Sequence, residues 1–94
     1  MAHYVGILDG SGDVWGVRFP DVPGCVGAGT SPEDAITDAT VALGEVMDFK
    51  RHERYDLPKA SSVSEVLASG QIGPGEAAVL IPLVLDAGVP VPAA

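Results

Sequence analysis

The chain has 94 residues, of which 47% are hydrophobic and 19% are charged, and its formal net charge is -8. One small domain fits this length, since single domains commonly span roughly 100–150 residues, and a second full domain does not. Thirteen acidic against five basic side chains repel phosphate backbones, so we expect no direct nucleic-acid partner. We also expect a cytoplasmic protein without a membrane partner. No apolar run reaches the roughly 18–20 residues that cross a bilayer, and the N-terminal residues do not resemble a secretory signal.

The first third of the chain predicts three antiparallel strands. Residues 4–8 are rich in β-forming side chains, and a Gly- and Asp-rich turn separates them from residues 14–19. Two prolines then bracket a bend before a third short strand at residues 25–28. In the second strand the period of two places one set of side chains on the face that should meet a helix: Trp15, Val17 and Phe19.

The middle of the chain predicts a long helix from Pro32 to about His52. Ser31 is suited to cap this helix, Pro32 to its first turn, and Asp34 to the acidic position of a capping box. An apolar stripe along the helix should cover the sheet. The stripe consists of Ile36, Ala39, Leu43, Val46 and Met47, with Ala35, Ala42 and Phe49 widening it.

The last third predicts a two-turn helix and one more strand. Ser62 and Glu65 form a capping box, and Gly70 ends the short helix. Residues 77–85 are almost continuously apolar, which indicates a strand buried on both faces, whereas Pro82 indicates an edge or a bulge. Residues 87–94 are expected to form a flexible tail after a domain of residues 1–86.

The predicted order is β-β-β-α-(short α)-β. It indicates an α+β fold with a three-stranded antiparallel sheet, a fourth strand and one long covering helix. The fourth strand could return parallel to its neighbour through the crossover that the helices provide.

Residues capable of catalysis do not form a convincing set. Asp9, Glu45 and Asp86 could hold divalent metal ions if their carboxylates converged, but Asp9 and Asp86 are explained more simply as turn residues at strand ends. Cys25 has no histidine near it in sequence and is expected to pack as a small apolar group. We therefore expect no enzymatic activity, no cofactor and no metal.

Three segments carry a resemblance to a known family. They are the bend FPDVPGC (residues 19–25), the helix start GTSPEDA (29–35) and the stretch LPKASS (57–62). Together they resemble the HicB-like antitoxin family, over residues 4 to about 85. The resemblance implies a truncated RNase H-like fold without that enzyme's activity. It also implies a partner, a small basic HicA-like toxin ribonuclease that is blocked in the complex.

Members of this family commonly continue into a DNA-binding module, a ribbon-helix-helix or helix-turn-helix unit. This chain ends in Pro- and Ala-rich residues instead, so the module was either removed or never present. Repression of the chain's own operator is therefore not carried over from the resemblance.

We expect the chain to act as an antitoxin-type inhibitor that occludes the RNA-binding or catalytic surface of its toxin. The alternative is an orphan HicB-like regulatory or scaffold module without a toxin. The candidate toxin-binding residues are acidic: Asp21, Glu33, Asp34 and Asp38. We also expect a homodimer or higher homo-oligomer that buries part of the last strand through Val79, Ile81, Leu83 and Leu85.

Overall fold

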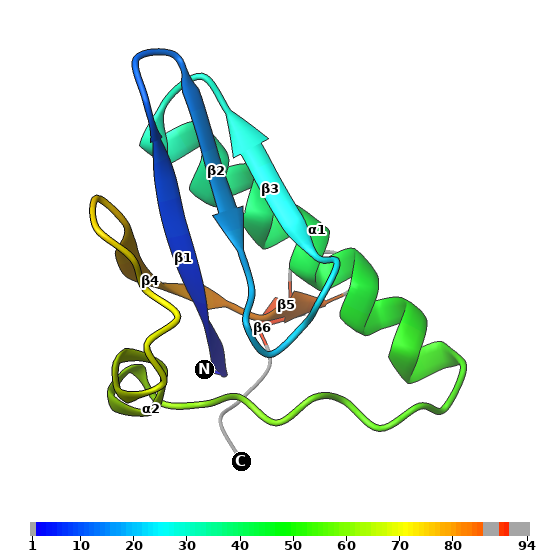
Figure 1. The fold of residues 1–94 in the computed structure, drawn as a ribbon. Coiled ribbons are helices and arrows are strands. Elements are labelled where there is room, and N and C mark those ends of the chain that lie inside the picture. Colours follow the sequence, from blue (N-terminus) through cyan, green and yellow to red (C-terminus); the bar gives the residue numbers. More distant parts are fainter. Residues whose placement is uncertain (1, 86–88, 91–94) are drawn as a thin grey trace.

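A computed structural model describes residues 2–85 and 89–90 of the chain. The model has a four-stranded sheet, a two-stranded sheet and two helices (Figure 1). The elements follow one another as β1 (His3–Ser11), β2 (Val14–Arg18), β3 (Val26–Gly29), α1 (Pro32–His52), α2 (Val63–Ala68), β4 (Ala77–Pro82), β5 (Val84–Leu85) and β6 (Val89–Pro90). In this part of the chain no helix is both long and apolar enough to cross a membrane.

The main sheet has the order β3-β2-β1-β4, and every pair in it is antiparallel. The parallel return considered for the last strand is therefore wrong. After α1 the chain runs back to α2 below the strands in the view of Figure 1, and the loop that follows α2 rises alongside β1. β4 consequently begins beside the end of β1, with Ala77 opposite Leu8, and ends beside its start, with Pro82 opposite His3.

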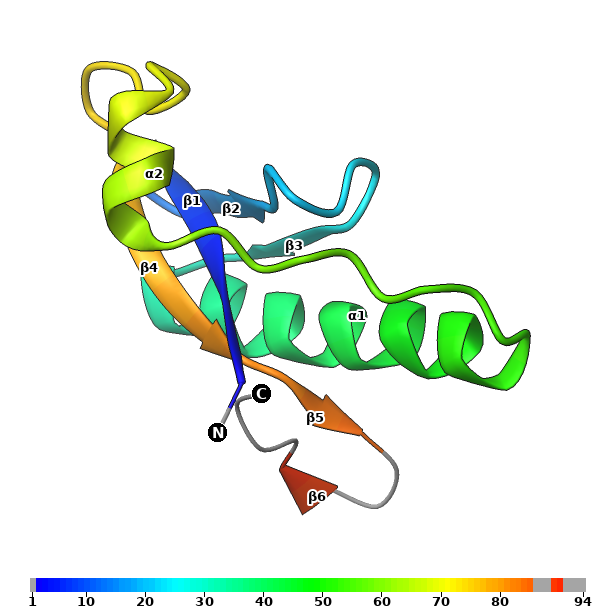
Figure 2. The ribbon, with the colours of Figure 1, turned by 90° about the horizontal axis from the view of Figure 1, so that it is seen from below.

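The single strand predicted at residues 77–85 is divided in the structure. β4 ends at Pro82, and β5 then pairs with β6 in a separate two-stranded sheet that lies beside α1 (Figure 2). At this departure the chain lies close against α1, since a Cβ atom on Gly44 would lie 2.5 Å from the carbonyl oxygen of Val84. The predicted tail contributes Val89–Pro90 to β6, and its other residues lie outside the described part of the chain.

The main core lies between α1 and one face of the sheet (Figure 2). The predicted apolar stripe of α1 is confirmed, with Ala35, Ala39, Leu43 and Met47 fully buried. Phe49 is the exception, because its side chain is 59% exposed. Its ring instead contacts that of Tyr55 just after the helix, with ring centroids 6.4 Å apart.

A smaller core lies on the opposite face of the sheet. Val66 of α2 packs there against Val5 and Ile7 of β1. The two-turn helix therefore covers only the part of this face near β1 and β4, and the part over β2 and β3 stays open.

α2 begins as its capping residues predict, and α1 does so except that Asp34, expected as the acid of a capping box, directs its carboxylate to Thr30. The Ser31 hydroxyl accepts a hydrogen bond from the Asp34 amide (3.1 Å), and Pro32 follows at the first helical position. Ser62 and Glu65 bond reciprocally, at 3.1 and 2.9 Å, which completes a capping box at α2. The carboxylate of Asp34 accepts from the Thr30 hydroxyl, at 3.2 Å.

Candidate functional site

The carboxylates considered for catalysis are not brought together. Asp9 lies on the open face of the sheet, whereas Glu45 lies on α1, which packs on the other face. Asp86 lies outside the described residues. Across residues 2–85 and 89–90, no group of three His, Cys, Asp or Glu side chains is placed to hold a metal ion.

Cys25 is buried in the main core, as the sequence predicts. Burial raises the pKa of its thiol, because the apolar surroundings disfavour the thiolate. His52 accompanies Asp48 at the end of α1, with its Nδ1 atom 2.8 Å from the Asp48 carbonyl oxygen. His52 thus lies in the last turn of α1, where a basic side chain complements the negative end of the helix dipole.

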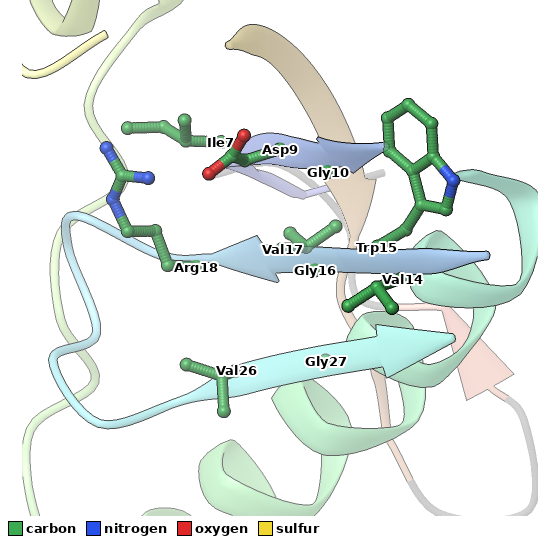
Figure 3. A pocket seen from close by; sticks show the side chains of 10 residues that line it. All are labelled: Ile7, Asp9, Gly10, Val14, Trp15, Gly16, Val17, Arg18, Val26 and Gly27. Atoms are coloured by element: carbon green, nitrogen blue, oxygen red, sulfur yellow. The ribbon is translucent and has the colours of Figure 1, made fainter. Parts of the chain in front are cut away.

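The open face of the sheet carries a shallow trough of about 370 Å³ (Figure 3). Alternation along the strands turns Asp9, Arg18 and Val26 away from α1. Gly16 lies between them and has no side chain, so the floor of the trough there is bare backbone. We call this surface the sheet trough. It is lined by Ile7, Asp9, Gly10, Val14, Trp15, Gly16, Val17, Arg18, Val26 and Gly27.

Arg18, which lines the sheet trough, belongs to an ion pair that sequence analysis did not anticipate. The Arg18 guanidinium donates to both carboxylate oxygens of Glu76, at 2.7 and 3.0 Å, and to the Gln71 carbonyl at 2.9 Å. The hydrogen bonds from Arg18 and from the Gly73 amide lower the pKa of Glu76 to about 2. This pair holds the loop between α2 and β4 against the sheet. The feature of the sequence that could have drawn attention to Arg18 is that it is the only Lys or Arg in the first 49 residues.

The four acidic residues proposed to bind a toxin are divided between two places. Asp21 lies in the loop between β2 and β3 and holds the α1–α2 linker, since its carboxylate accepts from the Ser61 amide (2.7 Å) and hydroxyl (2.9 Å). The other three, Glu33, Asp34 and Asp38, lie at the start of α1, which is the opposite end of β3 (Figure 1).

At the start of α1 the acidic side chains differ in how they are engaged. Asp38 accepts a hydrogen bond from the Ala28 amide at 2.9 Å, and Asp34 accepts from Thr30. Glu33 is exposed, and no hydrogen bond or ion pair joins it to another residue of the described chain. These acids also compensate the positive end of the helix dipole.

The acidic residues continue along α1 as a stripe. Positions 34, 38, 41, 45 and 48 follow the three- and four-residue spacing of one helix face, over roughly 21 Å at 1.5 Å per residue. Four of them are acidic and the middle one is Val41, which is 55% exposed. We call this the α1 acidic stripe. Beside its second half lies a hollow of about 300 Å³ lined by Thr40, Val41, Gly44, Glu45, Asp48 and Val84.

The side chains proposed to form a dimer interface face inward. Ile81, Leu83 and Leu85 are buried in the main core, and Val79 packs against them. Leu80 faces the other way and is 57% exposed. The last strand is therefore apolar on both faces, as the sequence indicates, but one of those faces is covered by the chain's own helix.

These features define a small α+β domain with a sheet half open on one side and an acidic helix on the other. Residues 4–86 match the family described as HicB_like antitoxin of bacterial toxin-antitoxin system. The chain belongs to this family, which confirms the resemblance found in the sequence. The family is one of antitoxins and not of enzymes.

A named relative is similar over part of its length. Antitoxin HicB 2 of Photorhabdus laumondii is 35% identical over 51 residues, which are 54% of this chain and 37% of that protein. The similarity therefore covers little more than a third of this relative.

Solved structures share the fold over more of the chain. The crystal structure of the Burkholderia pseudomallei antitoxin HicB has a TM-score of 0.76 and 25% identity, covering 92% of this chain and 68% of that one. The N-terminal domain of the same antitoxin has a TM-score of 0.72 and 22% identity, covering 87% and 98%. A HicA3 and HicB3 toxin-antitoxin complex contains a chain with a TM-score of 0.61 and 19% identity, covering 90% and 99%.

Proposed function

We propose that this antitoxin binds and neutralises a small basic HicA-like toxin ribonuclease. The observation that carries the proposal is the match of residues 4–86 to an antitoxin family. A structurally similar chain occurs in a HicA3 and HicB3 complex, which supports a partner of the HicA kind. The net charge of -8 supports a basic partner, because complementary charges favour association.

The surface that we propose for the toxin is the α1 acidic stripe, together with Glu33 beside its start. Asp34, Asp38 and Glu45 are exposed along one helix, and Val41 adds apolar area in their midst. Asp48 is half-buried and is paired with Arg51 at 2.8 Å. The hollow next to Val41 and Glu45 can receive the stem of a Lys or Arg side chain, with the charged end beside a carboxylate. We leave Asp21 out of this surface, because it lies in the loop between β2 and β3, where its carboxylate accepts from Ser61.

The experiment is coexpression with a basic protein of toxin size encoded next to this chain. The wild-type antitoxin should restore growth and copurify with that protein. Glu45→Lys should weaken the complex by at least about tenfold, because a like charge would face a basic surface. The matched control is Asp13→Lys, which makes the same charge change in the exposed turn between β1 and β2.

Unchanged toxicity without copurification would refute the proposal and favour the orphan regulatory or scaffold module. Equal weakening by Glu45→Lys and Asp13→Lys would keep the toxin as partner but remove the α1 acidic stripe as its binding surface, since only net charge would then matter. A complex that both variants retain at full affinity would also remove the stripe.

A further inference from the structure

Gly16 lies in the middle of β2, and nothing in the described part of the chain requires a glycine there. Five of the other described glycines adopt a positive φ, and a Cβ atom on each of the rest would lie 3.3 Å or closer to a neighbouring atom. On Gly16 the nearest atom would be the Gly27 carbonyl oxygen at 3.5 Å, which is an ordinary contact. A glycine inside a strand weakens that strand, and it is found where a ligand or another chain approaches the backbone closely. Gly16 therefore keeps open a space that the chain itself does not fill.

The space above Gly16 is the centre of the sheet trough. Across the strands Gly16 lies opposite Asp9 of β1 and Ala28 of β3, and along β2 it lies between Val14 and Arg18 on the same face. Strand spacing makes this floor roughly 10 Å across the sheet and roughly 13 Å along β2. The trough thus offers bare backbone over an area that one flat side chain covers.

The apolar side chains of the trough are left in water. Val14 is 73% exposed and Val26 is 60% exposed, although both belong to strands of the main sheet. Figure 3 shows Val26 on one side of β2 and Asp9 on the other. An occupant seated between these walls would remove apolar area from water, which is the main driving force of association.

The polar groups of the trough add one available acceptor. Asp9 is exposed, and no hydrogen bond or ion pair joins it to another residue of the described chain. Arg18 is engaged elsewhere, because its guanidinium donates to Glu76 and to the Gln71 carbonyl. Its side chain is held toward that loop, so it does not fold over Gly16 and does not satisfy Asp9.

These properties select among the side chains that a partner could place on Gly16. A Lys or Arg side chain would bring a second cation beside the Arg18 guanidinium. An aliphatic side chain would cover Asp9 without giving its carboxylate a donor. A ring that carries a donor meets both conditions, since it is neutral, packs flat on backbone and can donate to Asp9.

We propose that the sheet trough binds a Trp or Tyr side chain that a partner protein presents. The ring lies over Gly16 between Val14 and Val26, and its indole N–H or phenol O–H donates to the Asp9 carboxylate. Trp and Tyr are also the side chains that most often dominate the energetics of protein interfaces. The trough is shallow and open, so a polypeptide, which adds contacts along the rims, suits it better than a free aromatic molecule.

This site is separate from the surface proposed for the toxin. The α1 acidic stripe lies beyond the opposite face of the sheet, because α1 packs on the face that the trough does not occupy (Figure 2). The trough therefore adds a second kind of partner, recognised through an aromatic anchor rather than through positive charge.

The experiment titrates the isotope-labelled chain with capped pentapeptides, an aromatic or control residue flanked by two alanines on each side. Wild type should bind the Trp and Tyr peptides with saturable amide shifts centred on Asp9, Gly16 and Val26, and with dissociation constants of about 1 mM. The Phe peptide should bind at least about threefold more weakly than the Tyr peptide, because it lacks only the hydroxyl donor. The Arg peptide should cause no shifts centred on the trough.

Two variants test the assigned contacts. Gly16→Val should raise the dissociation constant of the Trp peptide at least about tenfold, because its side chain takes the place of the ring, and the chain should stay folded because that space is open. The matched control is Ala77→Val, which adds the same side chain at an exposed position of β4 outside the trough and should stay within about twofold of wild type. Asp9→Ala should make the Tyr and Phe peptides bind equally.

Four results would overturn the proposal. They are no saturable binding of the Trp and Tyr peptides, unchanged binding by Gly16→Val, equal binding of Tyr and Phe peptides to wild type, and preferential binding of the Arg peptide at the trough. Loss of a toxin complex in Gly16→Val, or loss of self-association in light scattering, would likewise overturn it, since the trough would then serve the toxin or a second copy. The peptides are measured without a toxin, so their failure leaves the proposed antitoxin function standing, and failure of that function leaves this site standing.

Discussion

At the scale of single residues, the ion pair of Arg18 and Glu76 joins parts of the chain that are far apart in sequence. Arg18 lies at the end of β2, and Glu76 ends the loop before β4. The pair is bidentate, the geometry in which guanidinium and carboxylate interact most strongly. Its contribution to stability is moderated by solvent, because the Arg18 side chain is 45% exposed. The pair nevertheless ties the loop to the end of β2, where Arg18 also lines the sheet trough.

The lowered pKa of Glu76 predicts a specific dependence of stability on pH. The carboxyl group has a pKa of about 2 in the folded chain, against an ordinary value of 4.5. Its stabilising effect is therefore complete above about pH 5 and is lost as the pH falls toward 2. Glu76→Gln should lower the thermal unfolding midpoint at neutral pH and flatten its decline between those values. Circular dichroism at a series of pH values measures both effects.

The control for this prediction is Glu53→Gln, a change of the same kind at the exposed C-cap of α1. That variant should keep the wild-type decline in the acidic range. If Glu76→Gln declined as steeply as wild type, the Arg18 contact would not lower the pKa of Glu76 in solution.

At the scale of elements, α1 approaches β3 backbone to backbone. A Cβ atom on Gly27 would lie 2.4 Å from the Ala39 amide nitrogen, and one on Gly29 would lie 2.6 Å from the Ala35 amide nitrogen. Neither distance can be relieved by rotating a side chain, because the obstructing atoms belong to the helix backbone. Two glycines two residues apart on the same face of β3 thus set the distance between helix and sheet.

Gly27→Ala should consequently destabilise the fold by on the order of 1–3 kcal/mol, the typical cost of overpacking a core. Gly16→Ala is the matched control on the neighbouring strand, where the nearest atom to a new Cβ is the Gly27 carbonyl oxygen at 3.5 Å. That variant should change the free energy of unfolding by less than about 1 kcal/mol, because the side chain enters the open sheet trough. Urea unfolding of both variants measures the difference. Equal effects would show that the β3–α1 distance adjusts freely.

Local signals explain which elements the sequence could predict. The start of α1 depends on Ser31 and Pro32, and that of α2 on Ser62 and Glu65, all within one helical turn of the boundary that they fix. Strand alternation similarly identified Val17 as a core residue, because the period of two is a property of the strand itself.

Features that depend on distant parts of the chain were not predictable in the same way. The direction of β4 depends on where the loop after α2 delivers the chain, and the close approach of Val84 to Gly44 joins residues 40 positions apart. The acidic residues show the same limit, since nothing in the sequence around Asp21 or Asp38 reveals that Ser61 or the Ala28 amide engages them. An acidic side chain in a sequence is equally suited to a partner protein and to its own backbone.

At the scale of the whole molecule, charge is distributed unevenly along the chain. Four of the five basic side chains fall within residues 50–59, at the end of α1 and in the linker that follows. The fifth, Arg18, is paired with Glu76. The first four turns of α1 therefore present negative charge without basic neighbours on the same helix, and the positive charge is concentrated at the far end of that helix.

This distribution predicts that association with a basic toxin depends strongly on salt. A negative field over the α1 acidic stripe steers a positive partner during diffusion, and mobile ions screen that field beyond about 8 Å at physiological ionic strength. The association rate constant should therefore fall at least about tenfold between 20 and 500 mM salt, while the dissociation rate constant changes much less. Stopped-flow mixing with the purified toxin measures both constants.

Glu45→Lys should reduce the salt dependence of association, and Asp13→Lys, at the turn between β1 and β2, should reduce it less because the turn lies away from the stripe. An association rate that does not respond to salt would mean that shape and apolar contact, rather than the acidic helix, bring the partner to this chain.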